Sequence, residues 1–135
     1  MILVDTGVWI DYFGGTRTPQ TDWLDDHLAV RRFLVGDLVL AEVLQGCRTD
    51  RQFDTLHAAL DRFRLLSIVD GQVAVAAARH YRTLRALGIT IRKTIDTLIA
   101  TRCIIADIPL LYGDRDFDPF VQHLGLRSAM QLPAH

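Results

Sequence analysis

The amino-acid sequence predicts an α/β domain built around a largely parallel sheet. Short apolar runs of strand length alternate with longer amphipathic segments of helix length along the whole chain. Repeats, low-complexity tracts and an obvious linker are absent from the sequence. Half of the 135 residues are apolar, which is enough to bury one substantial core. We therefore expect residues 1–135 to form a single domain.

The N-terminal part of the chain opens with an apolar run that reads as a buried strand. Gly14 and Gly15 end the brief helix that follows, and Thr18-Pro19 opens a loop into the next helix. Asp37 is expected to cap the helix that carries Glu42. The expected elements are a strand at 1–5, helices at 8–13 and 22–30, a short strand at 33–35, and a helix from 37 to about 46.

The C-terminal part repeats the alternation of helices and strands. Asp70-Gly71 marks a turn, Gly88 closes a long helix, and Asp118-Pro119 begins a short one, with Asp118 as its cap. The expected elements are helices at 50–63, 72–87, 94–105 and 118–124, and strands at 65–69, 108–112 and 127–130.

Four carboxylates lie in unusually apolar surroundings. Glu42 is the only glutamate of the chain and interrupts an apolar run, while Asp5, Asp96 and Asp114 each adjoin one. An ionised carboxylate near an apolar interior raises its pKa or requires a cation. Asp5 and Asp114 each follow a predicted strand, and ligands of open α/β sheets bind beyond the carboxyl ends of strands. The sequence thus predicts that these acids meet in one metal site.

Each acid also has a purely structural interpretation. Asp5 could form a turn, Asp96 could stabilise the positive end of its helix, and Asp114 could lie in a solvated loop. Glu42 could form a buried salt bridge with an arginine. The combination of four such acids favours a metal site, and oxygen ligands without clustered histidines match Mg²⁺ or Mn²⁺. The chemistry implied is hydrolytic phosphoryl transfer.

Charge and cysteine content narrow the class of protein further. Cys47 and Cys103 form no paired motif and are expected to be buried thiols, so zinc is unsupported. The bases number 15 against 16 acids, and all bases but Lys93 are arginine, which suits a nucleic-acid partner, although codon bias explains the arginines equally well. Without a signal peptide or membrane span in the sequence, we expect a soluble, cytoplasmic protein.

Four blocks of the sequence resemble a known family. In their order and spacing they are similar to the acidic blocks of PIN-domain ribonucleases, and specifically of the VapC-type toxins of bacterial toxin–antitoxin pairs. The resemblance spans nearly the whole chain. The blocks are MILVDTGVWID at 1–11, LAEVLQG at 40–46, IDTLIA at 95–100 and LLYGDRDF at 110–117.

The resemblance implies a three-layer α/β/α fold and a metal-dependent endoribonuclease. Asp5, Glu42, Asp96 and Asp114 would hold Mg²⁺ or Mn²⁺ for attack of an activated water on RNA, and Asp116 would be a further ligand or bind a water. Gly7 departs from the serine or other small residue that many relatives carry. The resemblance also implies a homodimer and a VapB-like antitoxin as partner. The proposed substrate contacts are Thr6, Arg92 and Lys93.

Other classes fit less well. A haloacid-dehalogenase-like phosphatase needs a second aspartate two residues after the first, where this chain has Gly7. A receiver domain would carry an acid pair after its first strand and a lysine after its last, but the only lysine is Lys93. The remaining alternative is a catalytically silent module that binds an antitoxin. Retention of all four acids argues against it, because repelling carboxylates gain nothing in a pure binding module.

Overall fold

The computed structural model describes residues 1–133, which fold as three layers with a parallel sheet in the middle. The four strands lie in the order β3-β2-β1-β4, and every pair of neighbours is parallel. The largely parallel α/β prediction is therefore confirmed. The strands are β1 (Ile2–Val4), β2 (Phe33–Gly36), β3 (Arg64–Leu66) and β4 (Leu110–Leu111).

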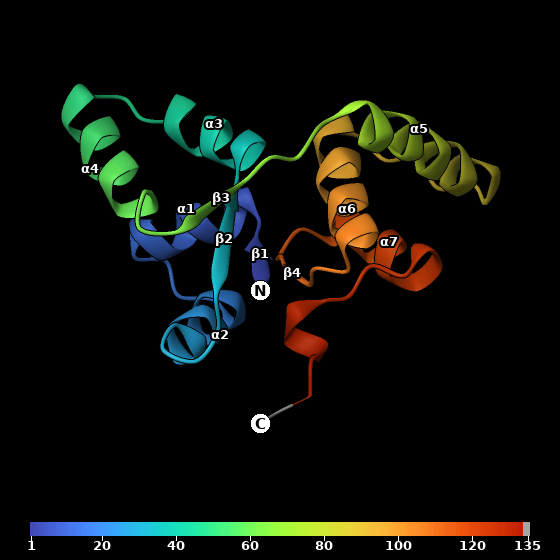
Figure 1. Cartoon of the computed structure of the whole chain (residues 1–135). Coiled ribbons are helices and arrows are strands. Elements are labelled where there is room, and N and C mark those ends of the chain that lie inside the picture. The colour runs from blue at the N-terminus through green and yellow to red at the C-terminus, as the bar shows by residue number, and fades with distance from the viewer. Residues whose placement is uncertain (134–135) are drawn as a thin grey trace.

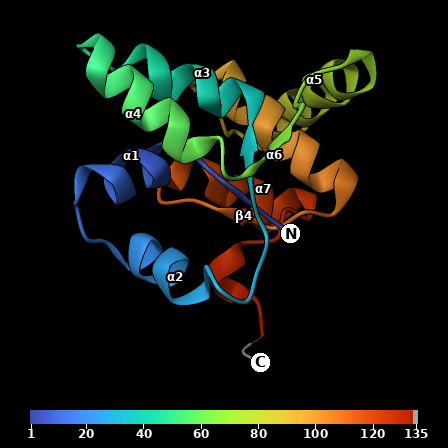
Figure 2. The ribbon, with the colours of Figure 1, turned by 60° about the vertical axis from the view of Figure 1, so that its left-hand side comes forward.

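Helices cover the two faces of the sheet in two sequential groups. Figure 1 shows α1 to α4 on one side of the strands and α5 to α7 on the other. Figure 2 again shows α3 beside α4 and α5 beside α6, and these pairs are in contact. The helices are α1 (Thr6–Gly14), α2 (Pro19–His27), α3 (Asp37–Gln45), α4 (Asp50–Leu60), α5 (Gly71–Ala86), α6 (Thr94–Ala106) and α7 (Asp118–Leu124), with 3₁₀ turns η1 (Arg115–Phe117) and η2 (Ala129–Gln131).

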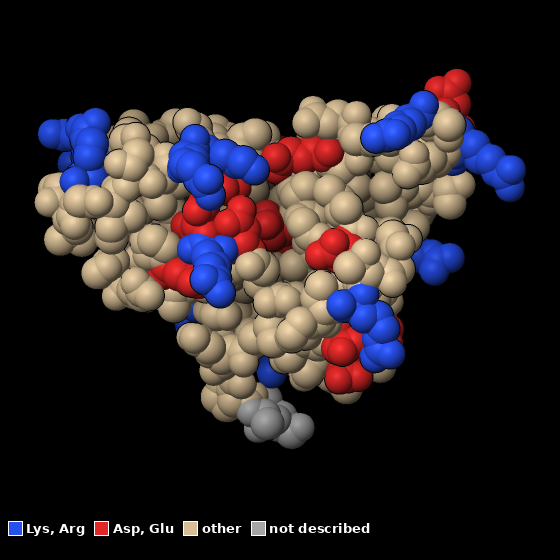
Figure 3. All heavy atoms as spheres, turned by 180° about the vertical axis from the view of Figure 1, so that it is seen from behind, with Lys and Arg blue, Asp and Glu red and all other residues tan. Residues whose placement is uncertain are grey.

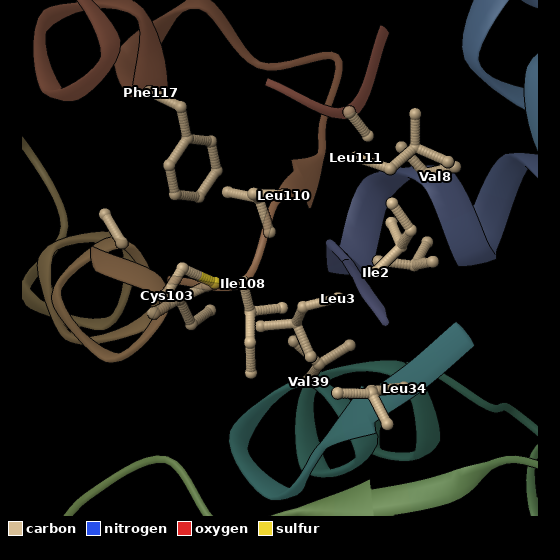
Figure 4. Close-up of a cluster of buried hydrophobic side chains, with 14 of the residues drawn as sticks. Ile2, Leu3, Val8, Leu34, Val39, Cys103, Ile108, Leu110, Leu111 and Phe117 are labelled. Carbon is tan, nitrogen blue, oxygen red and sulfur yellow. The ribbon is translucent and has the colours of Figure 1, made fainter. Parts of the chain in front are cut away.

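The core lies between the central strands and the helices on both faces. β1 is buried at every position, because it is paired on both edges and covered on both sides. Figure 4 shows Leu3 of β1 near Leu34 of β2 and Ile108, while Cys103 approaches from α6. Cys103 is buried and Cys47 half-buried, both as free thiols, so the expectation of buried thiols holds fully only for Cys103.

The starts of the first three helices differ from the sequence prediction, and α1 begins at Thr6 rather than at residue 8. The second helix begins at Pro19 rather than residue 22, because Thr18 and Thr21 form a reciprocal capping box in front of it. Asp37 does not cap α3: Gly36 holds the cap position. The Asp37 carboxylate instead accepts hydrogen bonds from the backbone nitrogens of Leu38 (2.8 Å) and Ile68 (3.0 Å), tying α3 to the segment after β3.

The end of the chain departs further from the prediction. The strand expected at 127–130 is wrong: a single parallel bridge joins Ser128 to Leu110, and the chain then turns into η2, which buries Ala129. Asp118 does not cap α7 either, since Phe117 occupies the cap and the Asp118 carboxylate accepts a 2.8 Å hydrogen bond from the Tyr112 hydroxyl.

Several predicted elements are shorter in the structure. The fourth helix ends at Leu60 rather than residue 63. β3 runs over residues 64–66 instead of the expected 65–69, and β4 over 110–111 instead of 108–112. Pro109 carries no backbone N–H and so cannot donate to a sheet ladder. Within residues 1–133, no helix combines the length and the apolar character that crossing a membrane requires.

Candidate metal centre

Asp5 follows β1 directly and is nearly removed from solvent. Its backbone nitrogen donates to the Leu111 carbonyl (2.9 Å), which fixes the residue between β1 and the end of β4. Asp5 occupies the cap position of α1, yet its side chain makes no capping hydrogen bond and is only 7% exposed. Burial raises the pKa of Asp5 to about 7; the backbone N–H of Thr6 opposes this rise, and the charges of Asp96, Glu42 and Asp114 add to it. The turn-forming interpretation leaves this buried carboxylate unexplained.

Asp96 lies in the first turn of α6 and is also buried. The residue is 6% exposed, and its Oδ2 is a buried oxygen without a hydrogen-bond partner. Burial raises the pKa of Asp96 to about 6, and nearby Lys93 opposes that rise. Buried polar atoms are almost always paired in folded proteins. The Oδ2 atom of Asp96 is therefore available to bind a ligand from outside the chain.

Glu42 projects from α3 and is positioned by Thr6. The Thr6 hydroxyl donates a 2.8 Å hydrogen bond to Oε1 of Glu42, across 36 positions of sequence. None of the three ion pairs found within residues 1–133 involves Glu42, so the alternative of a buried salt bridge to arginine fails there. The contact joins the first residue of α1 to the second half of α3, and these two helices follow the neighbouring strands β1 and β2.

Asp114 and Asp116 come from the turn after β4. The Asp114 carboxylate accepts a 2.9 Å hydrogen bond from the Asp116 backbone nitrogen, which shapes η1. Carboxylate oxygens of Asp96, Asp114 and Asp116 lie within 4.8 Å of one another. The exposed Arg92 guanidinium lies 3.4 Å from Asp116 and partly offsets this charge.

A pocket of about 430 Å³ unites most of these residues at the carboxyl end of the sheet. Figure 3 shows acidic side chains gathered in a hollow of this face, with basic side chains at its rim. Asp116 and Arg92 do not line the pocket themselves, but they lie close in sequence to residues that do. The lining contains six of the sequence-selected residues: Asp5, Thr6, Glu42, Lys93, Asp96 and Asp114.

Three polar residues of the pocket were missed by the sequence interpretation. Asp11, Thr18 and Gln20 also line it. The amide of Gln20 lies close to Gly113, so that a Cβ atom at position 113 would be in van der Waals contact with it. The capping box of Thr18 could have located the start of α2. Nothing local in the sequence indicates that this start faces the turn after β4, because that approach depends on how α2 packs against α1.

The donor set fits a hard divalent cation. The pocket offers carboxylate oxygens from four different chain segments and no histidine or cysteine among the residues that line it. Mg²⁺ and Mn²⁺ prefer such oxygen ligands. The orphaned oxygen of Asp96 and the raised pKa of both buried acids indicate that the carboxylates lack the positive charge that would balance them.

A larger hollow than the acidic pocket lies elsewhere and carries no such chemistry. It is a mainly apolar cleft of about 530 Å³ formed by α1, α3 and α4, with Phe13 and Leu56 among its lining residues. No carboxylate lines it, so chemistry is assigned to the smaller pocket. Ile10 borders both hollows, which makes them neighbours on the surface.

Comparison with known proteins places the chain in a family. A family model described as PIN domain matches residues 2–120. VapC ribonuclease Mb1587 of Mycobacterium bovis and ribonuclease VapC11 of Mycobacterium tuberculosis are each 30% identical over 131 residues, covering 96% of this chain and 98% of the relative.

Solved structures show the same fold at lower identity. VapBC2 from Rickettsia felis, bound to a DNA fragment from its promoter, has a TM-score of 0.75 at 17% identity, covering 95% of this chain and 97% of that one. FitAcB from Neisseria gonorrhoeae has a TM-score of 0.71 at 20% identity, covering 95% and 96%. The chain belongs to the PIN-domain family, and the relatives that it resembles within that family are VapC ribonucleases.

Proposed function

We propose that this protein is a metal-dependent endoribonuclease and the toxin of a VapBC-type toxin–antitoxin pair, active in the cytoplasm. Residues 1–135 would form one PIN domain. The observation that carries the proposal is the convergence of Asp5, Glu42, Asp96 and Asp114 in one polar pocket. The names of the mycobacterial relatives support the reaction, and the matched complexes support an antitoxin partner.

Asp5, Glu42, Asp96 and Asp114 would hold Mg²⁺ or Mn²⁺, with Asp116 as a further ligand or a partner for a bound water. When bound, the metal would lower the pKa of a water and offset the charge that develops on the phosphodiester. Hydrolysis forms a bond between the water oxygen and phosphorus and breaks the bond to the leaving ribose oxygen. Positive charge at this position would balance the four carboxylates and favour the ionised form of Asp5, whose pKa is raised chiefly by burial and further by the neighbouring acids.

The remaining polar residues would orient the ligands and the substrate. Thr6 holds one oxygen of Glu42 in place, so that the other stays free to bind the ion. Lys93 lines the pocket and Arg92 lies beside Asp116, where both would contact the RNA phosphate. Arg92 is largely exposed and can leave Asp116 when a phosphate arrives.

The antitoxin would use surfaces next to the pocket. The apolar cleft formed by α1, α3 and α4 adjoins the acidic pocket through Ile10, and both Ile10 and Phe13 are exposed. A partner segment could bury these side chains and reach the acids at the same time. A homodimer is the second assembly that we propose.

The test is cleavage of total RNA by the antitoxin-free protein with Mg²⁺ or Mn²⁺, with the fragment ends mapped. Discrete cuts should vanish with EDTA and in Asp96→Asn. They should persist in Asp26→Asn, which makes the same chemical change on the exposed surface of α2. Calorimetric titration with Mn²⁺ should show binding that Asp96→Asn weakens. Antitoxin binding without any RNA cleavage would favour the silent binding module instead.

A further inference from the structure

Four arginines surround another hollow at the opposite end of the sheet. Its volume is about 340 Å³. Arg31 and Arg32 come from the segment before β2, and Arg62 and Arg64 from the segment that enters β3. The strands are parallel, so the residues that precede them gather at one edge of the sheet, as the acids gather at the other. Met1, which precedes β1, also lines this arginine hollow.

The positive charge of the arginine hollow is not balanced by the chain. No aspartate or glutamate lines it, and the three ion pairs of residues 1–133 involve none of its arginines. Arg32, Arg62 and Arg64 are exposed, which leaves their guanidinium groups free to meet a ligand. Scattered solvated arginines would give no such concentration of one charge around a concave surface.

One of the four arginines is held in place. The guanidinium of Arg31 lies 6.0 Å from the centre of the Trp23 ring, within range of a cation–π contact. Trp23 in turn stacks on His27, with ring centres 3.9 Å apart, and the His27 Nδ1 lies 2.7 Å from the Trp23 carbonyl oxygen. Arg31 is half-buried, so part of its conformational entropy is already lost before a ligand binds.

We propose that the arginine hollow is a second RNA-binding site, which contacts backbone phosphates of the RNA whose scissile bond lies in the acidic pocket. The proposal rests on the ribonuclease function proposed above. Planar guanidinium groups bind phosphate oxygens in pairs, and four of them around one hollow match a polyanion. RNA phosphates are favoured over an acidic protein segment because a phosphate recurs at every nucleotide, and each can accept a pair of hydrogen bonds from one of the exposed arginines of this hollow.

The separation of the two sites sets the length of RNA that can use both. Met1 and Asp5 lie at opposite ends of β1, and four steps of roughly 3.3 Å place them about 13 Å apart. Stacked nucleotides advance about 3.4 Å each, so an RNA must extend beyond about four nucleotides from the scissile bond, and further along a curved surface. A folded or long RNA can therefore use both sites, whereas a trinucleotide reaches only one.

The experiment measures binding of a labelled RNA hairpin and of a labelled trinucleotide at several salt concentrations. Asp96→Asn protein in EDTA serves as the background, so that no RNA is cut. Arg32→Ala/Arg62→Ala should weaken hairpin binding about tenfold near physiological salt and reduce the slope of log K against log salt by about 1.4 to 1.8, depending on whether loop or stem phosphates are bound. The trinucleotide, which cannot span the two sites, should bind weakly to both proteins.

The matched control removes two exposed arginines of α5, in Arg79→Ala/Arg82→Ala, with the same change in net charge. Hairpin binding should be nearly unaffected there. Arg32→Lys/Arg62→Lys should restore most of the salt dependence, because charge is retained. Equal thermal unfolding of all variants would show that the fold is intact, as expected for exposed side chains.

Two results would overturn the second RNA site. If the α5 control weakened hairpin binding equally, the effect would come from net charge alone. If Arg32→Ala/Arg62→Ala bound the hairpin normally, the arginine hollow would not bind RNA. If that variant instead lost affinity for an acidic peptide, the hollow would bind protein. Binding is measured without cleavage, so the two proposals can fail separately. If the metal-loaded protein did not cleave RNA, the proposed function would be refuted, but the measured binding of RNA to the arginine hollow would stand.

Discussion

Replacing Asp5 with asparagine should stabilise the metal-free protein at alkaline pH. Asp5 is 7% exposed, makes no capping hydrogen bond and has a pKa raised from 3.8 to about 7, chiefly by burial. Ionising this side chain therefore costs stability. Asparagine has nearly the same shape as the neutral acid but never ionises, so the substitution removes that cost.

The sign and size of the effect follow from proton linkage. Below pH 3.8 both states hold the proton, and the native protein has its full stability. Between pH 3.8 and about 7 the native state keeps a proton that the unfolded chain releases, so the free energy of unfolding falls as pH rises. That interval corresponds to about 4 kcal/mol, which is lost by about pH 7 to 8.

The assay is urea unfolding in EDTA at pH 4 and pH 8. Asp5→Asn and the native sequence should be similarly stable at pH 4, and the variant should be more stable by up to about 4 kcal/mol at pH 8. Asp26→Asn, an exposed carboxylate on α2, should show no such gain. Equal or lower stability of Asp5→Asn at pH 8 would refute the assignment of a buried, unbalanced carboxylate. Saturating Mn²⁺ should remove the advantage of the variant if the proposed ligand set is correct.

Two further substitutions test how the site is held. Thr6→Val should weaken Mn²⁺ binding about tenfold in calorimetric titration, because Glu42 loses the 2.8 Å hydrogen bond, while Thr6→Ser should bind normally. Equal affinity in both variants would remove Thr6 from the positioning of Glu42. Asp37→Ala should lower the free energy of unfolding by about 1–3 kcal/mol in urea, since the backbone nitrogens of Leu38 and Ile68 lose their acceptor. Asp37→Asn keeps an oxygen acceptor, so its free energy of unfolding should fall less. An Asp37→Ala variant as stable as the native sequence would contradict this account.

Boundaries of elements were less predictable than their existence. The strand expected at 127–130 fails because residues that look extended locally make one bridge and then bury Ala129 through a 3₁₀ turn. Aspartate is a common helix-capping residue, but neither Asp37 nor Asp118 caps its helix. Asp37 instead accepts a hydrogen bond from the backbone nitrogen of Ile68, and Asp118 accepts one from the Tyr112 hydroxyl. Local preference for a cap is worth about 1 kcal/mol, which a competing buried hydrogen bond can match.

By itself, the sequence determined the order of strands and helices as far as α7 and marked the acids of the pocket. Apolar periodicity and the setting of Glu42 are local properties, since a carboxylate within an apolar run is anomalous in any fold that buries the run. Tertiary structure alone decided that Thr6 bonds Glu42, that Gln20 faces Gly113, and that the arginines before β2 and β3 converge. These contacts join segments far apart in the chain, and they depend on strand order and helix packing rather than on any local pattern.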